Sequence, residues 1–354
     1  MGGRAAVGLD IGTSGVRAAE LSLGRGAPKL ERFGQVAVPS GAVIDGEVVD
    51  VELVAAALKK LWAEVKFGTK RVALGVANQK VVVRQADMPW MEYDELRKAL
   101  SYQVADLIPM PVEQAILDFH PLEEFINDAG ARMLRVLLVA ASRDMISSAM
   151  AAVERAGLRP ISIDLSSFAV IRSLADPDHL GMASDAEALI DIGARVTNIA
   201  VHQGGVPRFV RILLMGGSDL TDAVAERLGV PTEEAEVTKQ QLGIPSDAGE
   251  RDAHPASRVI ESSVATFIEE VRGSLDYYLA SPGAIPIRRV VLSGGGSRLR
   301  NLGSRISTAC RLPVDTAEPM GSLRIGKTGL SDDQLTYVQP IVAVPVGLAL
   351  GVAS

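Results

Sequence analysis

Two segments of the sequence combine an aspartate with glycines and hydroxyl side chains, a combination suited to binding phosphate. The first, VGLDIGTSGVRAAEL at residues 7–21, is typical of two strands joined by a glycine-rich turn. Glycine lets backbone N–H groups approach phosphate oxygens, and hydroxyl and guanidinium groups can donate to the same oxygens. The candidate phosphate ligands are Gly12, Thr13, Ser14, Gly15 and Arg17. By itself, the segment is explained equally well by a plain hairpin with an Asx turn.

Asp10 lies at the end of the first strand and would repel a phosphate that it touched directly. Its natural role is to orient the waters of a magnesium ion, which keeps several of its own waters in protein sites. The second segment, ALIDIGARVTNIAV at 188–201, repeats the arrangement about half the chain later, with Asp191, Gly193 and Thr197. Such a long repeat predicts two related lobes. We therefore expect two hairpins to clasp phosphates from opposite sides, with magnesium between Asp10 and Asp191.

A glycine-rich segment follows a third predicted strand. In VVLSGGGSRLRNL, at residues 290–302, an apolar strand leads into Gly294, Gly295 and Gly296. A backbone without side chains lets a flat ring or a sugar lie against it. A helix that begins near Ser297 would favour negative charge at its N-terminus, and Arg298 is a further candidate ligand. The alternative is a tight strand-to-helix turn, which rarely needs three consecutive glycines.

Two smaller features could complete such a site. Gly216 and Gly217 precede a predicted helix, and Glu236 and Lys239 lie three residues apart on the next one. Residues at that spacing share a helix face, so this pair could hold ribose hydroxyls and flank a base. The alternative, which the pair considered alone favours, is a solvated surface ion pair.

Residues 321–328, GSLRIGKT, match the G-x-x-x-x-G-K-[ST] pattern of a P-loop. That motif requires a strand before it and a helix immediately after it. Pro319 interrupts the approach, Gly329 follows Thr328 at once, and no helix start is evident before Ser331. We therefore interpret the segment as an exposed, flexible connection.

Composition excludes several classes of function. A net charge of -7 and an aromatic content of 4% argue against binding nucleic acid. Cys310 is the only cysteine, which fits a reducing compartment, and the histidines lack the spacing of zinc ligands. The N-terminus lacks the apolar core of a secretory signal. Residues 334–354 carry no charge but contain Pro340 and Pro345, so they predict a buried helix and no membrane span. The histidines are His120, His179, His202 and His254.

The rest of the chain predicts alternating strands and helices. Residues 50–66 have the spacing of an amphipathic helix capped by Asp50, and a strand follows at 72–77. Residues 80–163 predict a separate unit in the order strand, helix, two strands, helix and strand, with its first helix ended by Pro109 and Pro111. In the second half, helices are expected at 216–229, to about 242 and at 258–280. Residues 245–257 are expected to form a polar, exposed connector.

The order of hairpin, insert, second hairpin, GGG loop and small-residue C-terminal helix resembles the actin-like ATPase superfamily. The resemblance implies an α/β fold of two lobes with ribonuclease-H-like topology. Here DLSSFAVIRSLA (164–175) and PIVAVPVGLALGVAS (340–354) are similar to the two connecting helices. The expected parts are a first lobe (1–79), an inserted subdomain (80–163), a first connecting helix (164–185), a second lobe (186–334) and a second connecting helix (335–354).

Within this superfamily the chain resembles the PilM proteins of type IV pilus machines and, next, the division protein FtsA. The PilM-like segments are LDIGTSGVRAAEL, VVVRQADMPWMEYDELRKALSYQVADLIPMPVEQAILDF, LLMGGSDLTDAVAERLGV and AEVTKQQLG. FtsA carries an amphipathic membrane-targeting tail, whereas the printed sequence ends at Ser354, directly after the connecting helix; this favours PilM. The remaining alternatives are an FtsA-like division protein and an actin-fold small-molecule kinase, although no sugar pocket or catalytic base is evident.

The PilM likeness implies ATP and Mg²⁺ as cofactors, with slow hydrolysis at most and no assignable catalytic residue. It also implies a cytoplasmic location at the inner face of the cell membrane. The implied partners are the N-terminal peptide of a PilN-like membrane protein and the pilus inner-membrane assembly complex. We expect the peptide to bind at the seam between the insert and the first lobe, on an exposed strand edge. The alternative is that the insert stabilises its lobe or mediates self-association.

Overall fold

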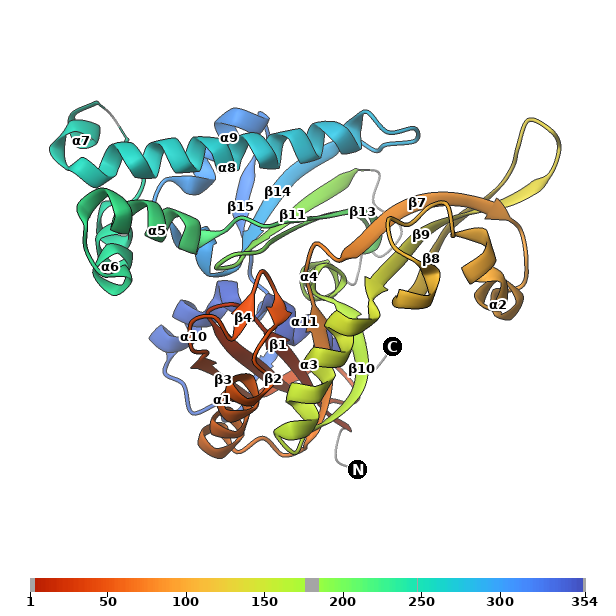
Figure 1. Ribbon diagram of the computed structural model, residues 1–354, viewed down its shortest axis with the longest axis horizontal. Coiled ribbons are helices and arrows are strands. Elements are labelled where there is room, and N and C mark those ends of the chain that lie inside the picture. The colour runs from red at the N-terminus through yellow and green to blue at the C-terminus, as the bar shows by residue number, and fades with distance from the viewer. Residues whose placement is uncertain (1–3, 176–184, 247, 353–354) are drawn as a thin grey trace.

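The computed structural model describes residues 4–175, 185–246 and 248–352. Figure 1 shows two lobes, one above the other, and a smaller sheet that projects from one side of the molecule. His179, and residues 176–184 of the region predicted as the first connecting helix, lie outside the described residues, as do 353–354 of the second. The mixed α/β class predicted from the sequence is confirmed.

The first lobe is built on a six-stranded sheet. Its strands, in spatial order, are β10 (Arg159–Leu165), β6 (Arg71–Val76), β1 (Arg4–Ile11), β2 (Gly15–Leu23), β3 (Lys29–Ala37) and β16 (Arg324–Ile325). A small hairpin, β4 (Val43–Ile44) with β5 (Glu47–Val48), follows β3. Helix α1 (Val51–Val65) begins where predicted, and the Asp50 carboxylate accepts a hydrogen bond from the Leu53 amide at 2.9 Å. Its buried residues, Leu58 and Leu61 among them, pack on the sheet together with α3 (Arg143–Arg155).

The second lobe is built on a five-stranded sheet with helices packed against it, of which α8 (Pro255–Leu279) is the longest. Its strands, in spatial order, are β13 (Val206–Leu213), β12 (Thr197–Gln203), β11 (Ala186–Ile192), β14 (Ile287–Ser293) and β15 (Val314–Thr316). Its helices are α5 (Gly217–Leu228), α6 (Thr232–Leu242), α7 (Ala248–Ala253), α8 (Pro255–Leu279) and α9 (Leu302–Cys310). Asp191 pairs in register with Asn198 across its hairpin, as Asp10 pairs with Arg17 across the first. In both lobes the strand that bears the aspartate also has a parallel neighbour, which supports the predicted relation between the halves.

Two helices pack against strands of both lobes. Helix α4 (Ser166–Leu174) and helix α11 (Ala343–Gly351) contact each other, and their apolar residues share one cluster with strands of both sheets. The contact is so close that a Cβ on Gly347 would lie 1.8 Å from the carbonyl oxygen of Ala169. One on Gly8, in β1, would lie 2.0 Å from the carbonyl oxygen of Pro345. Packing of α11 therefore requires glycine at Gly347 and at Gly8.

No single helix among the described residues is long and apolar enough to cross a membrane. One pair passes the same test of length and composition together, Asp332–Ile341 with Ala343–Gly351, but it is bent by 76°. The pair comprises α10 (Asp332–Val338), the 3₁₀ turn η4 (Gln339–Ile341) and α11. Residues 343–349 of α11 are buried in the fold.

The insert is smaller than predicted. Its separate sheet has three strands in the order β7 (Val81–Pro89), β9 (Arg132–Ser142) and β8 (Ala115–Ile126), with helix α2 (Tyr93–Gln103) and the short turn η1 (Val112–Gln114). Two segments assigned to it, α3 and β10, belong to the first lobe. Strand β10 pairs with β6 from Arg159 to Leu165, with one irregularity after Pro160, and α3 buries Ala149, Ala152 and Val153 in the core beneath α1. Pairing with distant residues, which local sequence does not encode, decides where these elements belong.

The small sheet was expected to meet the first lobe, but its seam involves residues of both lobes. At the base of the small sheet, Val81 belongs to the same apolar cluster as Val76 of the first lobe. That cluster also includes Ile212 of the second lobe. The Gln85 side chain donates to the carbonyl oxygen of Arg208 in β13 at 3.1 Å. The small sheet therefore borders both lobes, as Figure 1 also shows for β7 and β13.

Three predicted boundaries are wrong. Helix α2 ends at Gln103, before Pro109, because the chain turns there to bury Val104 and Ile108 in the cluster of the small sheet. The polar connector at 245–257 contains helix α7 and the start of α8. The glycine loop continues as a 3₁₀ turn, η3 (Gly295–Arg298), and α9 begins only at Leu302, because Asn301 adopts a left-handed conformation with φ of 70°.

Candidate functional site

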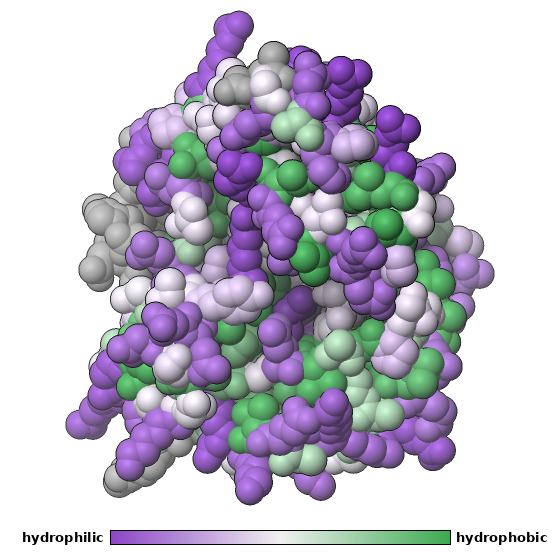
Figure 2. Space-filling view, turned by 90° about the vertical axis from the view of Figure 1, so that its left-hand side faces the viewer, coloured by the Kyte–Doolittle hydropathy of each residue, from purple (hydrophilic) through white to green (hydrophobic). Residues whose placement is uncertain are grey.

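A cavity of about 290 Å³ lies between the two lobes, at the turns of both aspartate hairpins. Figure 2 shows this side of the molecule hollowed near its middle, with hydrophilic side chains in the hollow. Most of the predicted site residues line the cavity. They are Asp10, Gly12, Thr13, Ser14, Arg17, Asp191, Gly193, Gly217, Glu236, Lys239, Gly294, Gly295, Gly296 and Arg298. Segments separated by almost the whole chain therefore meet at one place.

The two aspartates face each other from opposite lobes. Arg17 donates from Nη1 to Asp10 Oδ2 at 3.3 Å, and Ser293 donates from Oγ to Asp191 Oδ1 at 2.8 Å. Burial raises the pKa of Asp191 to about 6; the hydrogen bond from Ser293 opposes the shift, and the nearby charge of Asp10 adds to it. Burial also raises the pKa of Asp10, and Arg17 offsets this only in part.

Two carboxylates with raised pKa values, Asp191 buried and Asp10 partly buried, form a site that a divalent cation would suit. The cation would offset their mutual repulsion and their desolvation. Among the described residues, no group of three or more His, Cys, Asp or Glu side chains is placed to hold a metal. Two carboxylates instead match the way Mg²⁺ binds, with several waters retained. Asp10 and Asp191 thus fit the predicted magnesium site.

Glycine is required at the site for two reasons: a left-handed backbone at Gly294, and close backbone packing at Gly15 and Gly216. Gly294 has φ of +83°, and a Cβ there would lie 2.3 Å from the carbonyl oxygen of Ile192, so only glycine fits this turn. Cβ atoms on Gly15 and Gly216 would lie 2.7 Å from the oxygen of Val36 and 2.5 Å from that of Gly193. Neither Gly15 nor Gly216 lines the first cavity. They permit close backbone packing that shapes the two turns.

Glu236 and Lys239 are not the solvated surface pair that we considered as the alternative. Lys239 is 7% exposed and donates from Nζ to Gly217 O at 2.9 Å, Thr221 Oγ1 at 2.8 Å and Glu236 Oε2 at 2.7 Å. Burial raises the pKa of Glu236, but hydrogen bonds from Lys239 and Thr221 outweigh it, and the net shift is downward. All three donors of the ammonium group are therefore used to tie α5 to α6 at the cavity wall.

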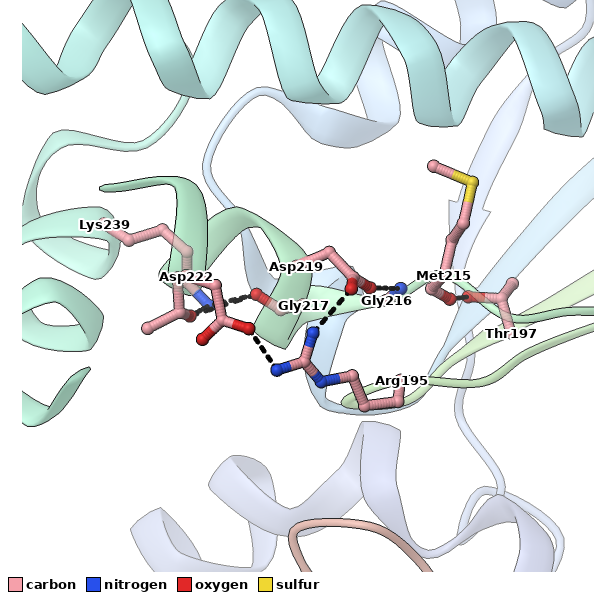
Figure 3. A network of polar contacts seen from close by, with 9 residues as sticks. Arg195, Thr197, Met215, Gly216, Gly217, Asp219, Asp222 and Lys239 are labelled. Carbon is pink, nitrogen blue, oxygen red and sulfur yellow. Dashed lines mark hydrogen bonds and ion pairs between the residues drawn. The ribbon is translucent and has the colours of Figure 1, made fainter. Parts of the chain in front are cut away.

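Arg195 is a cavity residue that the sequence analysis missed. It lies in the turn of the second hairpin and donates from Nη1 to Asp219 Oδ1 at 2.6 Å and from Nη2 to Asp222 Oδ2, as Figure 3 shows. Asp219 Oδ2 also accepts from the Gly216 amide at 2.7 Å. The network holds the hairpin turn against the start of α5. The sequence places Arg195 in the predicted turn between Asp191 and Thr197, and this position could have identified it as a residue of the site.

Two predicted ligands are turned away from the cavities. Thr197 is fully buried and donates from Oγ1 to the carbonyl oxygen of Met215 at 2.7 Å, so its hydroxyl ties the start of β12 to the loop between β13 and α5 (Figure 3). Ser297 donates from Oγ to the carbonyl oxygen of Gly294 at 2.7 Å and stabilises the glycine loop. Neither residue lines a cavity of the cleft, so a phosphate contact by either hydroxyl is not supported.

A second cavity, of about 210 Å³, adjoins the first. The two share seven lining residues: Gly217, Glu236, Lys239, Gln240, Gly295, Gly296 and Arg298. Beyond them the second cavity is lined mainly by apolar side chains of the second lobe, such as Leu220, Phe267 and Leu302, with Gly216 at its edge. The cleft therefore has a polar part between the lobes and an apolar part within the second lobe.

The P-loop-like segment lies elsewhere. Strand β16 falls inside the motif and pairs in parallel with Lys29 and Leu30 at the edge of the first sheet. The next helix, α10, begins at Asp332, and Lys327 is exposed and lines neither cavity. A P-loop needs its helix directly after the glycine turn, so the segment is not one. It is an edge strand and not only the flexible connection that we expected.

The two lobes with their insert have the actin-like ATPase fold. EutJ from Carboxydothermus hydrogenoformans shares this fold, with a TM-score of 0.55 at 17% identity over 98% of this chain and 89% of that one. The family described as type IV pilus assembly protein PilM matches residues 8–352, and the chain belongs to that family.

Two further relatives place the chain within the class. One protein of a PilM–PilN type IV pilus biogenesis complex superposes with a TM-score of 0.86, at 26% identity over 99% of this chain and 98% of that one. The cell division protein FtsA of Bacillus subtilis is 28% identical over 67% of this chain. That match spans 58% of the length of FtsA. The predicted resemblance to PilM, with FtsA as a more distant relative, is confirmed.

Proposed function

We propose that the cleft binds ATP together with Mg²⁺. The observation that supports this is the meeting of two hairpin turns from two lobes, with Asp10 and Asp191 facing one cavity and the glycine loop beside it. Asp10 and Asp191 would hold the cation through its waters, and the cation would offset the charge of the phosphates. Backbone amides of the turns and the hydroxyls of Thr13 and Ser14 would donate to phosphate oxygens.

A thermal-shift titration with Mg-ATP tests this proposal. At a hundredfold excess over the dissociation constant, binding should stabilise the protein by about 2.7 kcal/mol. Asp10→Ala and Asp191→Ala should reduce this gain without unfolding the protein. Asp128→Asn, an exposed aspartate in the β8–β9 turn, serves as the control and should respond like the wild type. Equal stabilisation of all four proteins would exclude the two-hairpin model.

We further propose that the protein is a cytoplasmic component of the type IV pilus assembly machinery. In this role it binds the N-terminal cytoplasmic peptide of a PilN-like inner-membrane protein and is held at the inner face of the membrane through that partner. The match to the PilM–PilN complex, with a TM-score of 0.86 over 99% of the chain, carries this proposal. We assign ATP the role of a structural or switching ligand with slow turnover at most, because no residue of the cleft is identified as one that activates water.

We assign peptide binding to the small sheet. Strands β7 and β8 are its two edges, and an edge strand can pair with an extended peptide while alternate apolar side chains enter pockets. None of the residues on β7, β8 or β9 lines the two cavities of the cleft. The two ligands would therefore bind to separate parts of the chain, and mutations can separate them.

A deletion tests this assignment. Removing 80–163 would also remove α3 and β10 from the first-lobe core, so the cut has to be shorter. Val83 and Val139 are paired partners in β7 and β9, and an Asn-Gly turn can join them in place of residues 84–138. In calorimetry this variant should no longer bind the partner's N-terminal peptide and should still bind Mg-ATP. Full peptide affinity in the folded variant would refute the assignment.

The matches to FtsA favour one alternative, a division protein of the same fold. The peptide experiment separates the two, because a PilM-type function requires binding of a PilN-like N-terminus. Failure of every such peptide to bind the wild-type protein would favour the division protein.

A further inference from the structure

The apolar part of the cleft has a planar cation at its mouth. The second cavity is lined on the inside by side chains such as Leu220, Phe267 and Leu299, while Arg298 lines both cavities at their junction. Arg298 is exposed and is the last residue of the 3₁₀ turn that follows the glycine loop. Its guanidinium group therefore stands where a ligand would pass from the polar to the apolar part.

One face of that guanidinium group is covered by a tyrosine. The Arg298 Cζ atom lies 4.0 Å from the centre of the Tyr337 ring, and Arg298 Nη2 donates to the carbonyl oxygen of Tyr337. Tyr337 lies on α10, far from Arg298 in the sequence, and it also lines the second cavity. Tyr337 is 61% exposed, so it is not there to fill a core.

The segment that carries Tyr337 is tied to the glycine loop. The Gly294 amide donates to the carbonyl oxygen of Pro340 at 2.8 Å, three residues after Tyr337. Two independent hydrogen bonds thus join α10 and η4 to the loop that bears Arg298. A long arginine side chain is normally free to rotate, and these contacts hold its plane in one orientation.

We propose that Tyr337 is a positioning residue for the base of the bound nucleotide. This inference rests on the proposed nucleotide function. The Tyr337 ring fixes the guanidinium plane of Arg298, and a heteroaromatic base in the second cavity packs against that plane. The phosphates then occupy the first cavity, and the sugar lies at the junction beside Glu236 and Lys239. Tyr337 acts on base affinity through Arg298 and has no part in phosphate binding.

The experiment is calorimetric titration of the full chain with Mg-ATP and with Mg-ADP. Tyr337→Ala should weaken binding of both about two- to fivefold, the range expected for loss of a solvent-exposed cation–π contact. The ratio of the two dissociation constants should stay unchanged, because the lost contact lies at the base. Tyr337→Phe keeps the ring and should bind like the wild type. Tyr277→Ala removes a tyrosine of similar exposure, 63%, away from both cavities, and should have no effect.

A double-mutant cycle separates positioning from a general structural role. In an Arg298→Ala background the guanidinium plane is gone, so Tyr337→Ala should change the dissociation constant less than about twofold. Independent, additive losses would overturn the proposal, as would wild-type affinity in Tyr337→Ala or a changed ratio of ATP to ADP affinity. If the wild-type protein binds neither nucleotide, the proposed function fails and this inference fails with it. Wild-type binding with an unaffected Tyr337→Ala refutes the inference alone.

Discussion

Replacing Asp191 with asparagine should stabilise the protein when no nucleotide or metal is present. Asp191 is 9% exposed, and the pKa of its carboxyl group is raised from 3.8 to about 6, mainly by burial. A raised pKa means that the folded state favours the protonated form. The associated stability is complete below pH 3.8 and is lost as the pH rises through 6. Above pH 6 the folded protein therefore carries the cost of an ionised, desolvated carboxylate.

The magnitude follows from the shift. Each pKa unit corresponds to about 1.4 kcal/mol, so ionised Asp191 destabilises the fold by about 3 kcal/mol at pH 8 and by about half of that at pH 5. Asparagine has the same shape, and its amide oxygen can still accept from Ser293, now 2.8 Å from Asp191. Any intrinsic cost of the amide is the same at both pH values. The difference in free energy of unfolding between Asp191→Asn and the wild type should therefore grow by about 1.4 kcal/mol from pH 5 to pH 8, whatever that cost is.

Urea denaturation at pH 5 and pH 8, without metal or nucleotide, measures this change. The denaturant dependence m should match between wild type and Asp191→Asn, so that the midpoints report stability. Asp128→Asn, a change of an exposed residue in a turn, provides the control, and its stability relative to the wild type should be the same at both pH values. A mutant advantage that is the same at both pH values would refute the argument that burial of a charge sets the pKa. Mg-ATP should then stabilise the wild type more than Asp191→Asn, because the mutant has lost one of the two carboxylates.

The remaining predictions concern single residues of the loops. Lys327→Ala should leave the dissociation constant for Mg-ATP unchanged in calorimetry, because Lys327 is exposed and lines neither cavity; a steep loss would revive the P-loop interpretation. Gly294→Ala should lower the free energy of unfolding by more than about 1 kcal/mol, since its φ of +83° and a contact of 2.3 Å exclude a Cβ. Gly295→Ala, whose nearest contact would be 3.9 Å, is its matched control and should unfold at nearly the wild-type temperature.

The site residues that the sequence predicts well are those whose backbone needs a particular residue type. Gly294 adopts a conformation that only glycine tolerates, so the requirement is visible in the sequence. Asp10 and Asp191 stand out for a related reason: each is the last residue but one of a largely apolar strand, where a carboxylate has no structural purpose of its own. The repetition of strand, aspartate and glycine turn then identified the two halves, and the hairpin registers of the two lobes agree with it.

The failures are residues whose role depends on direction or on distant contacts. Thr197 follows the hairpin turn as a phosphate ligand would, but its side chain points to the buried side and bonds to Met215. Successive residues of a strand point to opposite faces, so an error of one position reverses the interpretation. Lys239 shows the opposite error. The sequence favours a solvated ion pair with Glu236, whereas tertiary contacts bury Lys239 against Gly217 and Thr221.

Elements at the junction of the lobes were the hardest to assign, and the cause is physical. The pattern of β10 predicts a strand correctly, but whether that strand joins the small sheet or the sheet of the first lobe depends on which edge is available to pair with it. Strand β6 offers such an edge, and α3 follows because its buried face needs the core beneath α1. The small sheet is left with three strands whose base contacts both lobes through Val76 and Ile212. A part of the chain placed in this way can contact a partner without lining the cleft, so binding at the two places can be tested by separate mutations.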